Sequence, residues 1–132
     1  MTYLVDTNVL SEARRGAPEA VAWLRSVDPA AIYLSVVTLG EIAEGIAIKA
    51  RRDLRAASAL TAWLDRLRDR HRDRILAVDD RVALAWGRLA AERPRPMADG
   101  LIAATALVHD MTIVTRNVAD FDGCGIGIIN PW

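Results

Sequence analysis

The stretch YLVDTNVLSEARRG, residues 3–16, decides the fold. It begins with a short run of strand-forming residues, Tyr3–Val5, and the run ends in an acid, Asp6. A helical pattern follows from about Asn8 to Arg15 and stops at Gly16, a residue that suits the position after a helix. A strand that passes directly into a helix predicts an α/β unit with a carboxylate at the carboxyl end of the strand.

Four further runs have the same character. Each is short, aliphatic at odd and even positions alike and bounded by polar turns, as in strands covered on both faces. Because helical patterns separate them, we expect an α/β fold with a central parallel sheet of four to five strands flanked by helices. These strands are predicted at 31–34, 75–78, 112–115 and 126–129, and the remaining helices at 18–27, 36–49, 52–73, 80–93 and 98–109, with a protruding hairpin around 49–53.

The composition is that of a single globular domain, residues 1–132. Hydrophobic residues make up 52% of the chain, and 17 basic residues balance 17 acidic ones, so net charge favours neither nucleic acid nor membrane as a partner. The single cysteine, Cys124, excludes an internal disulfide. No signal peptide and no membrane-spanning stretch is visible, so we expect a cytoplasmic protein without a membrane partner.

Acidic or amide side chains recur where strands end and the next helices begin. Ligands of open α/β sheets bind outside the carboxyl ends of the strands, so these side chains are expected to converge on one rim. Asp6 closes the first strand, and Glu41 lies about two turns into the helix after Ser35. The complete set is Asp6, Glu41, Asp99, Asn117 and Asp120.

Each acid also has a structural explanation. Asp6 and Asp99 could cap helices, the commonest use of Asp at such positions. Glu41 could be an exposed helix residue, since Ile42 and Ile46 supply a buried face. Several clustered carboxylates, however, repel and raise one another's pKa. A divalent cation would neutralise such a cluster, and oxygen ligands without His or Cys favour Mg²⁺ or Mn²⁺ over zinc.

A site of this kind is suited to phosphodiester chemistry. A metal ion binds a phosphate oxygen and lowers the pKa of an attacking water. Thr115 or Arg116 could hold the phosphate, and helix N-termini beside the acids would point N–H groups at the same anion. Thr7 and Asn8, next to Asp6, are expected to support the site.

Four segments together resemble the PIN-domain ribonucleases, most closely the VapC/FitB-type toxins of bacterial type II toxin–antitoxin modules. They are YLVDTNVLSE, LSVVTLGEIAEGI, MADGLIAATALVHDMTIVTRNVADF and INPW, and they cover essentially the whole chain. The resemblance implies a Rossmann-like three-layer fold and Mg²⁺-dependent cleavage of RNA, with Mn²⁺ as a substitute. It also implies a homodimer inhibited by a small cognate antitoxin, with operator DNA reached only through that antitoxin.

The resemblance also assigns roles to residues. Asp6 and Asp99 correspond to the principal metal ligands, and Glu41 to the acid that helps bind the metal and orient water. Asn117 occupies the fourth acidic position, where its carbonyl oxygen can coordinate but supplies no charge. The expected catalytic set is Asp6, Glu41, Asp99 and Asn117, the metal ligands are Asp6, Asp99 and Glu41, and the supporting residues are Thr7, Asn8, Thr115, Arg116 and Asp120.

A second interpretation is a catalytically idle domain that binds an antitoxin and, through it, operator DNA. The neutral net charge favours it, because RNA affinity usually needs clustered cations. Three mutually repelling carboxylates argue against it, because an inert scaffold has no need of them. A receiver domain and an aspartyl phosphatase are disfavoured, since Asp79-Asp80 follows the wrong strand and residues 6–8 lack the D-x-D pattern.

The remaining candidates receive structural roles. His71 lies in a charged segment and is expected to be solvated, and His109 is expected to interact with carbonyls at a helix end. Trp23, Trp63 and Trp86 are expected in the core or in an interface. We also expect an apolar groove for an antitoxin helix among the early helices.

Overall fold

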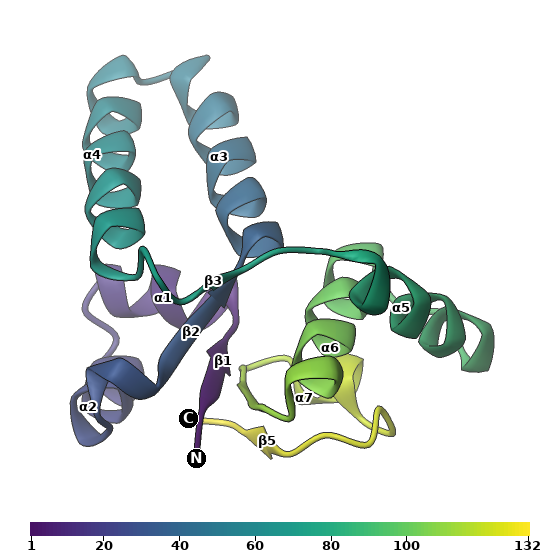
Figure 1. Cartoon of the computed structure of the whole chain (residues 1–132). Helices are drawn as coiled ribbons and strands as arrows, with labels where there is room; N and C mark the ends of the chain where they lie inside the picture. Colours follow the sequence, from purple (N-terminus) through teal and green to yellow (C-terminus); the bar gives the residue numbers. More distant parts are fainter.

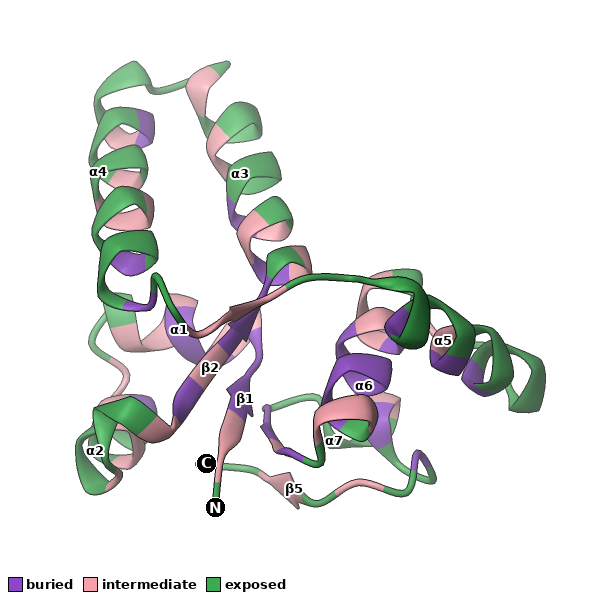
Figure 2. Cartoon of the chain, viewed as in Figure 1, coloured by how far each residue is buried: buried purple, intermediate pink, exposed green.

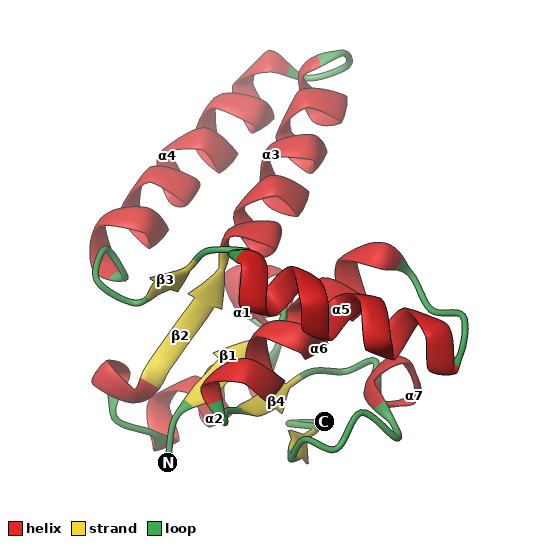
Figure 3. Ribbon diagram, turned by 45° about the vertical axis from the view of Figure 1, so that its right-hand side comes forward, coloured by secondary structure: helices red, strands yellow, loops and turns green.

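Five short strands form one parallel sheet in the computed structural model, which describes residues 1–132 (Figures 1 and 3). They lie in the order β3-β2-β1-β4-β5, and every neighbouring pair is parallel. The strands are β1 (Tyr3–Val5), β2 (Ile32–Ser35), β3 (Ile75–Leu76), β4 (Thr112–Val114) and β5 (Ile128–Ile129). All five predicted strands are confirmed, and the first of them occupies the centre of the sheet.

Seven α-helices connect the strands. They are α1 (Thr7–Arg14), α2 (Pro18–Ser26), α3 (Val36–Ala50), α4 (Leu54–Arg70), α5 (Asp80–Glu92), α6 (Met97–His109) and α7 (Val118–Phe121). The six predicted helices are confirmed to within about three residues at either end. The sequence did not predict α7 or the 3-10 helix Pro29–Ala31, because one turn is too short to show a periodic pattern. None of the helices has both the length and the apolar character needed to cross a membrane.

Consecutive residues of the central strands build two separate cores. Leu4 and Ile113 pack into a cluster with α5 and α6, whereas Val5 and Val114 pack into one with α1, α2 and α4. Successive side chains of a strand point to opposite faces, so each aliphatic residue belongs to one core or the other. Burial in Figure 2 is accordingly concentrated in the strands and in the sheet-facing sides of the helices. The result is the predicted three-layer arrangement.

Helices α3 and α4 form the predicted hairpin, which projects away from the sheet (Figure 1). Asp53 caps α4 by accepting the backbone N–H of Ala56 at 3.0 Å. Ser35 caps α3 in the same way, by accepting the N–H of Val37 at 3.0 Å. Both caps satisfy donors that a helix N-terminus leaves free, and so they fix where each arm begins.

The prediction for His71 was wrong. Its side chain is buried, at 6% exposure, and a ring nitrogen lies 2.9 Å from the Leu67 carbonyl oxygen. His71 is the C-cap of α4 and continues the apolar stripe of Leu64 and Leu67. Residues three and four apart share one helix face, so the stripe carries His71 inward despite its charged neighbours.

Candidate active site

Asp6 lies where β1 ends and α1 begins, and it is 3% exposed. Its Oδ1 accepts the Thr7 N–H at 2.8 Å, which makes Asp6 the N-cap of α1. Its Oδ2 accepts the Thr115 hydroxyl at 2.8 Å and the Asn8 amide at 3.2 Å. The capping explanation is therefore correct for Asp6, and a second set of bonds from the end of β4 fixes the carboxylate at the rim.

Burial raises the pKa of the Asp6 carboxyl above its usual value, because a low-dielectric setting penalises the charged form. Hydrogen bonds from Thr115 and Thr7 oppose that rise, and the negative charges of Glu41 and Asp120 add to it. Asp6 takes part in none of the four ion pairs of the chain. The carboxylate is held in place by neutral donors, with no cation to offset its charge.

Glu41 joins the site through Thr7. The Thr7 hydroxyl donates to Glu41 Oε1 at 2.7 Å, since an ionised carboxylate can only accept. The same Thr7 oxygen lies 3.2 Å from the buried Thr38 hydroxyl and accepts its proton. Glu41 is thus tied to α1 rather than free on the helix surface. Thr38 was not predicted as a site residue, although it lies one turn before Glu41 on the same face of α3.

Asp99 lies in the first turn of α6 but does not cap it, because the N-cap is Pro96. Its pKa is raised to about 7, first by burial and then by the neighbouring carboxyl of Asp120 and the negative charges of Asp6 and Glu41. Asp99 therefore lies beside Asp120 and Asp6, and the capping explanation for Asp99 is wrong.

Asp120 lies nearer to the other acids than a supporting role implies. Its charge raises the pKa of Asp6 and of Asp99, whereas Asn117 contributes its backbone N–H to the Thr115 hydroxyl oxygen at 3.0 Å and is exposed. The four carboxylates brought into electrostatic contact are Asp6, Glu41, Asp99 and Asp120. Asp120 belongs with the principal acids, and Asn117 helps to hold Thr115.

Arg116 stands at the edge of this cluster. Its backbone N–H donates to Asn8 Oδ1 at 3.2 Å, and its guanidinium carbon lies 4.9 Å from the centre of the Trp132 ring. The aromatic face stabilises the cation and limits its movement. Asn8, Thr115 and Arg116 are therefore placed around Asp6 as the sequence predicted.

The acids suit a hard divalent cation in their chemistry, but they are not grouped in advance. They offer only oxygen ligands, and no Lys, Arg or His is paired with them. The structure contains no group of three or more His, Cys, Asp or Glu side chains already placed to hold a metal ion.

A family model described as the PIN domain matches residues 3–122. The chain is 33% identical to Toxin FitB of Neisseria gonorrhoeae over 137 aligned residues, which span 98% of this chain and 97% of that protein. It is 31% identical to VapC ribonuclease Y4jK of Sinorhizobium fredii over 98% of this chain and 96% of that protein.

Solved structures give the same result. The crystal structure of FitAcB from Neisseria gonorrhoeae superposes with a TM-score of 0.90 at 32% identity, covering 99% of each chain. A toxin–antitoxin complex from Klebsiella pneumoniae superposes with a TM-score of 0.72 at 28% identity, covering 99% of this chain and 98% of the other. The fold described above is therefore shared with solved toxin–antitoxin structures.

Proposed function

Because the chain belongs to the PIN-domain family, we propose that it is a Mg²⁺-dependent endoribonuclease and the toxin of a type II toxin–antitoxin system. One observation carries this proposal: four carboxylates meet at the carboxyl ends of the central strands without a cationic partner. The relatives named as a toxin and as a ribonuclease support it. We propose that it acts in the cytoplasm as a homodimer of a single domain, residues 1–132.

We assign the metal to Asp6, Asp99 and Glu41, with Asp120 as the fourth acid and Mn²⁺ as a substitute ion. When bound, the ion would supply positive charge to a phosphate oxygen and lower the pKa of an attacking water. The protein's own contribution is placement. Thr7 and Thr115 hold Glu41 and Asp6 by hydrogen bonds of 2.7 and 2.8 Å, so that neither carboxylate must be ordered during the reaction.

The rim also offers groups for the phosphate. Arg116, supported by Trp132, is the one cation stacked beside the acids, and we assign it to the scissile phosphate. Arg suits that role because its planar fork can donate two hydrogen bonds to one phosphate. Asn8 holds the backbone of Arg116 and the carboxylate of Asp6 at once, and so it fixes the distance between phosphate contact and acid.

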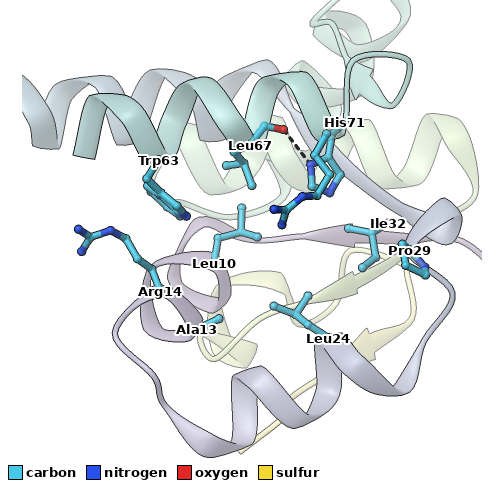
Figure 4. A pocket seen from close by; sticks show the side chains of 10 residues that line it. Leu10, Ala13, Arg14, Leu24, Pro29, Ile32, Trp63, Leu67 and His71 are labelled. Carbon is cyan, nitrogen blue, oxygen red and sulfur yellow. Dashed lines mark hydrogen bonds between the residues drawn. The ribbon is translucent and has the colours of Figure 1, made fainter. Parts of the chain in front are cut away.

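An apolar groove fits the antitoxin (Figure 4). It encloses about 500 Å³ between α1, α2 and the second half of α4, and six of its ten lining residues are hydrophobic. Leu10, Leu24 and Leu67 point into it, and His71 closes one end (Figure 4). An amphipathic helix binds such a groove through side chains on one face. We propose that the antitoxin docks here and that operator DNA is reached only through it.

The test is cleavage of RNA by the purified protein, freed of any antitoxin. We expect cleavage with Mg²⁺, none after EDTA, and a loss of at least roughly 10²-fold for Asp6→Asn, the scale seen when one charge-stabilising group is removed. Asp65→Asn, an exposed acid on α4 outside the cluster, should leave the rate unchanged. Equal decay rates in wild type and Asp6→Asn would contradict the enzyme.

The alternative remains an idle domain that binds an antitoxin within a DNA-binding complex. It is favoured by the finding that the carboxylates are not already grouped around a metal position. The same experiment separates the two functions. An idle domain would form the antitoxin complex normally while showing no RNA cleavage that EDTA abolishes.

A further inference from the structure

A second groove opens from the acid site and has a different character from the antitoxin groove. It encloses about 480 Å³ between α1, α3 and α4. Thr7 and Glu41, which are joined by the 2.7 Å hydrogen bond, line one end of it. The groove is thus continuous with the proposed catalytic rim, and whatever occupies it must approach Glu41.

Three cations also line this groove. Arg14, Arg15 and Lys49 all line it, although the chain as a whole has no net charge. Lys49 belongs to no ion pair, and Arg15 pairs only with Glu12 at the surface, where such a pair contributes little. These three cations give the groove a local positive charge that the chain as a whole lacks, and such charge is what binds a phosphate backbone.

One wall of the groove is aromatic. Trp63 lines this groove as well as the antitoxin groove, and Arg14 lies 5.8 Å from the centre of its ring (Figure 4). This pair marks the border between the two grooves. Aromatic faces and neighbouring cations are the combination by which proteins hold single-stranded nucleic acid.

The dimensions agree with a short piece of strand. Seven residues separate Thr7 from Arg14 along α1, a distance of about 10 Å at 1.5 Å per residue. Stacked nucleotides advance by about 3.4 Å each, so two to three of them span that length. One phosphate at the acids and others at the cations would therefore fit a single continuous strand.

We propose that this groove binds the RNA strand next to the cleaved bond, with backbone phosphates at Arg15 and Lys49 and a base against Trp63. The proposal rests on the ribonuclease function and makes the substrate single-stranded where it enters the groove. The apolar antitoxin groove shares Arg14 and Trp63 with this groove and is also lined by Arg70, but none of the rim acids lines it. Only the second groove therefore connects cations to the acid site.

Filling the groove tests the proposal directly. Gly45 on α3 lines it, and a Cβ atom added there meets nothing within 4 Å. Gly87 on α5 has the same open surroundings and lies outside the groove, so Gly87→Leu is the matched control. Both changes should favour the helix, since Leu has the higher helical propensity. Binding is measured by fluorescence anisotropy with a short mixed-sequence single-stranded RNA, in the Asp6→Asn background to prevent cleavage.

We expect Gly45→Leu to weaken RNA binding by at least about tenfold, the effect of losing one stacked base. RNA binding by Gly87→Leu should be unchanged. Lys49→Gln should lower the slope of log Kd against log salt by about 0.7, the value for one phosphate contact to a single strand. Arg88→Gln, an exposed cation on α5 without an ion pair, should leave the slope unchanged.

Other occupants give different results. A result in which Gly45→Leu keeps its RNA affinity but loses neutralisation by a co-expressed antitoxin would assign the groove to the antitoxin and overturn the proposal. If Gly45→Leu keeps its RNA affinity but no longer forms a dimer in gel filtration, the groove belongs to a second copy of the chain, and the proposal is again overturned. If wild type cleaves RNA and Gly45→Leu equals it in RNA binding and cleavage, only the RNA-binding role of the groove is rejected. If wild type neither binds nor cleaves RNA, the proposed ribonuclease function itself is rejected.

Discussion

At the scale of single residues, the site is defined by carboxylates that destabilise one another. Asp99 is the clearest case, because burial and three neighbouring acids raise its pKa to about 7 from 3.8. Between pH 3.8 and about pH 7, Asp99 carries a proton in the folded protein but not in the unfolded chain. Stability in the absence of metal therefore falls as pH rises through that window, and it is unaffected by this group below pH 3.8.

Asp99→Asn should relieve this penalty. We expect the metal-free melting temperature at pH 8 to rise by roughly 2–5 °C, the change for about 1 kcal/mol in a domain of this size, and the gain to vanish near pH 4. Stabilisation by added Mg²⁺ should shrink in the variant, because a ligand has been removed. Thermal melts across pH, with and without Mg²⁺, measure both effects.

Asp80→Asn provides the control for Asp99→Asn. Asp80 is an exposed acid in the first turn of α5, as Asp99 is in the first turn of α6. Its replacement removes a favourable interaction with the helix dipole and nothing else, so no gain is expected at pH 8. A lower melting temperature for Asp99→Asn in both metal conditions would show that its carboxylate stabilises α6 instead.

At the scale of elements, the sequence predicted the strands and the long helices well. Short aliphatic runs such as Tyr3–Val5 and Thr112–Val114 are unambiguous when polar turns bound them. The contact between Asp99 and Asp120 could not be predicted, because it depends on how α7 packs beside α6. His71 could have been placed correctly, since the spacing from Leu64 and Leu67 continues the buried face of α4.

The buried His71 gives α4 a dependence on acid. Burial lowers the pKa of His71, and Arg74 and Arg70 lower it further, while its bond to the Leu67 carbonyl and the charge of Asp73 oppose the change. The unfolded chain therefore binds the proton more readily as pH falls below about 6.5. We expect His71 to lower the free energy of unfolding there by at most about 1.4 kcal/mol per pH unit, a contribution opposite in sign to that of Asp99.

Denaturant melts of wild type and His71→Gln between pH 5 and 8 measure this contribution as the difference between their two slopes. His109→Gln, at the only other histidine of the chain, is the control and should keep the wild-type slope. An unchanged acid response in His71→Gln would contradict the assignment. The position matters for function because His71 also closes the antitoxin groove (Figure 4).

At the scale of the whole molecule, two grooves on α1 and α4 meet at Arg14 and Trp63. One is mainly apolar, and the other joins cations to the acid rim. We therefore expect partner binding and RNA cleavage to be separable by mutation. Ala13 lines only the apolar groove, and Ala22 is an exposed residue of α2 outside both grooves.

Ala13→Phe should fill the apolar groove and abolish neutralisation by a co-expressed antitoxin, because the antitoxin helix can no longer seat its side chains. The rate of RNA cleavage should stay within about twofold of wild type. The melting temperature should stay within a few degrees of wild type, as for a surface change. Ala22→Phe should leave both neutralisation and cleavage intact. Cell growth with and without the antitoxin reports neutralisation, and loss of cleavage in Ala13→Phe would contradict the separation.

The position of β1 at the centre of the sheet has a consequence for synthesis. Asp6 is made well before its partners Thr115 and Asp120, which follow more than a hundred residues later in the chain. β1 also pairs with β4, so its second edge stays open until that strand leaves the ribosome. A nascent chain therefore cannot assemble the acid rim, and the ribosome is not exposed to a working nuclease until translation of this domain is nearly over.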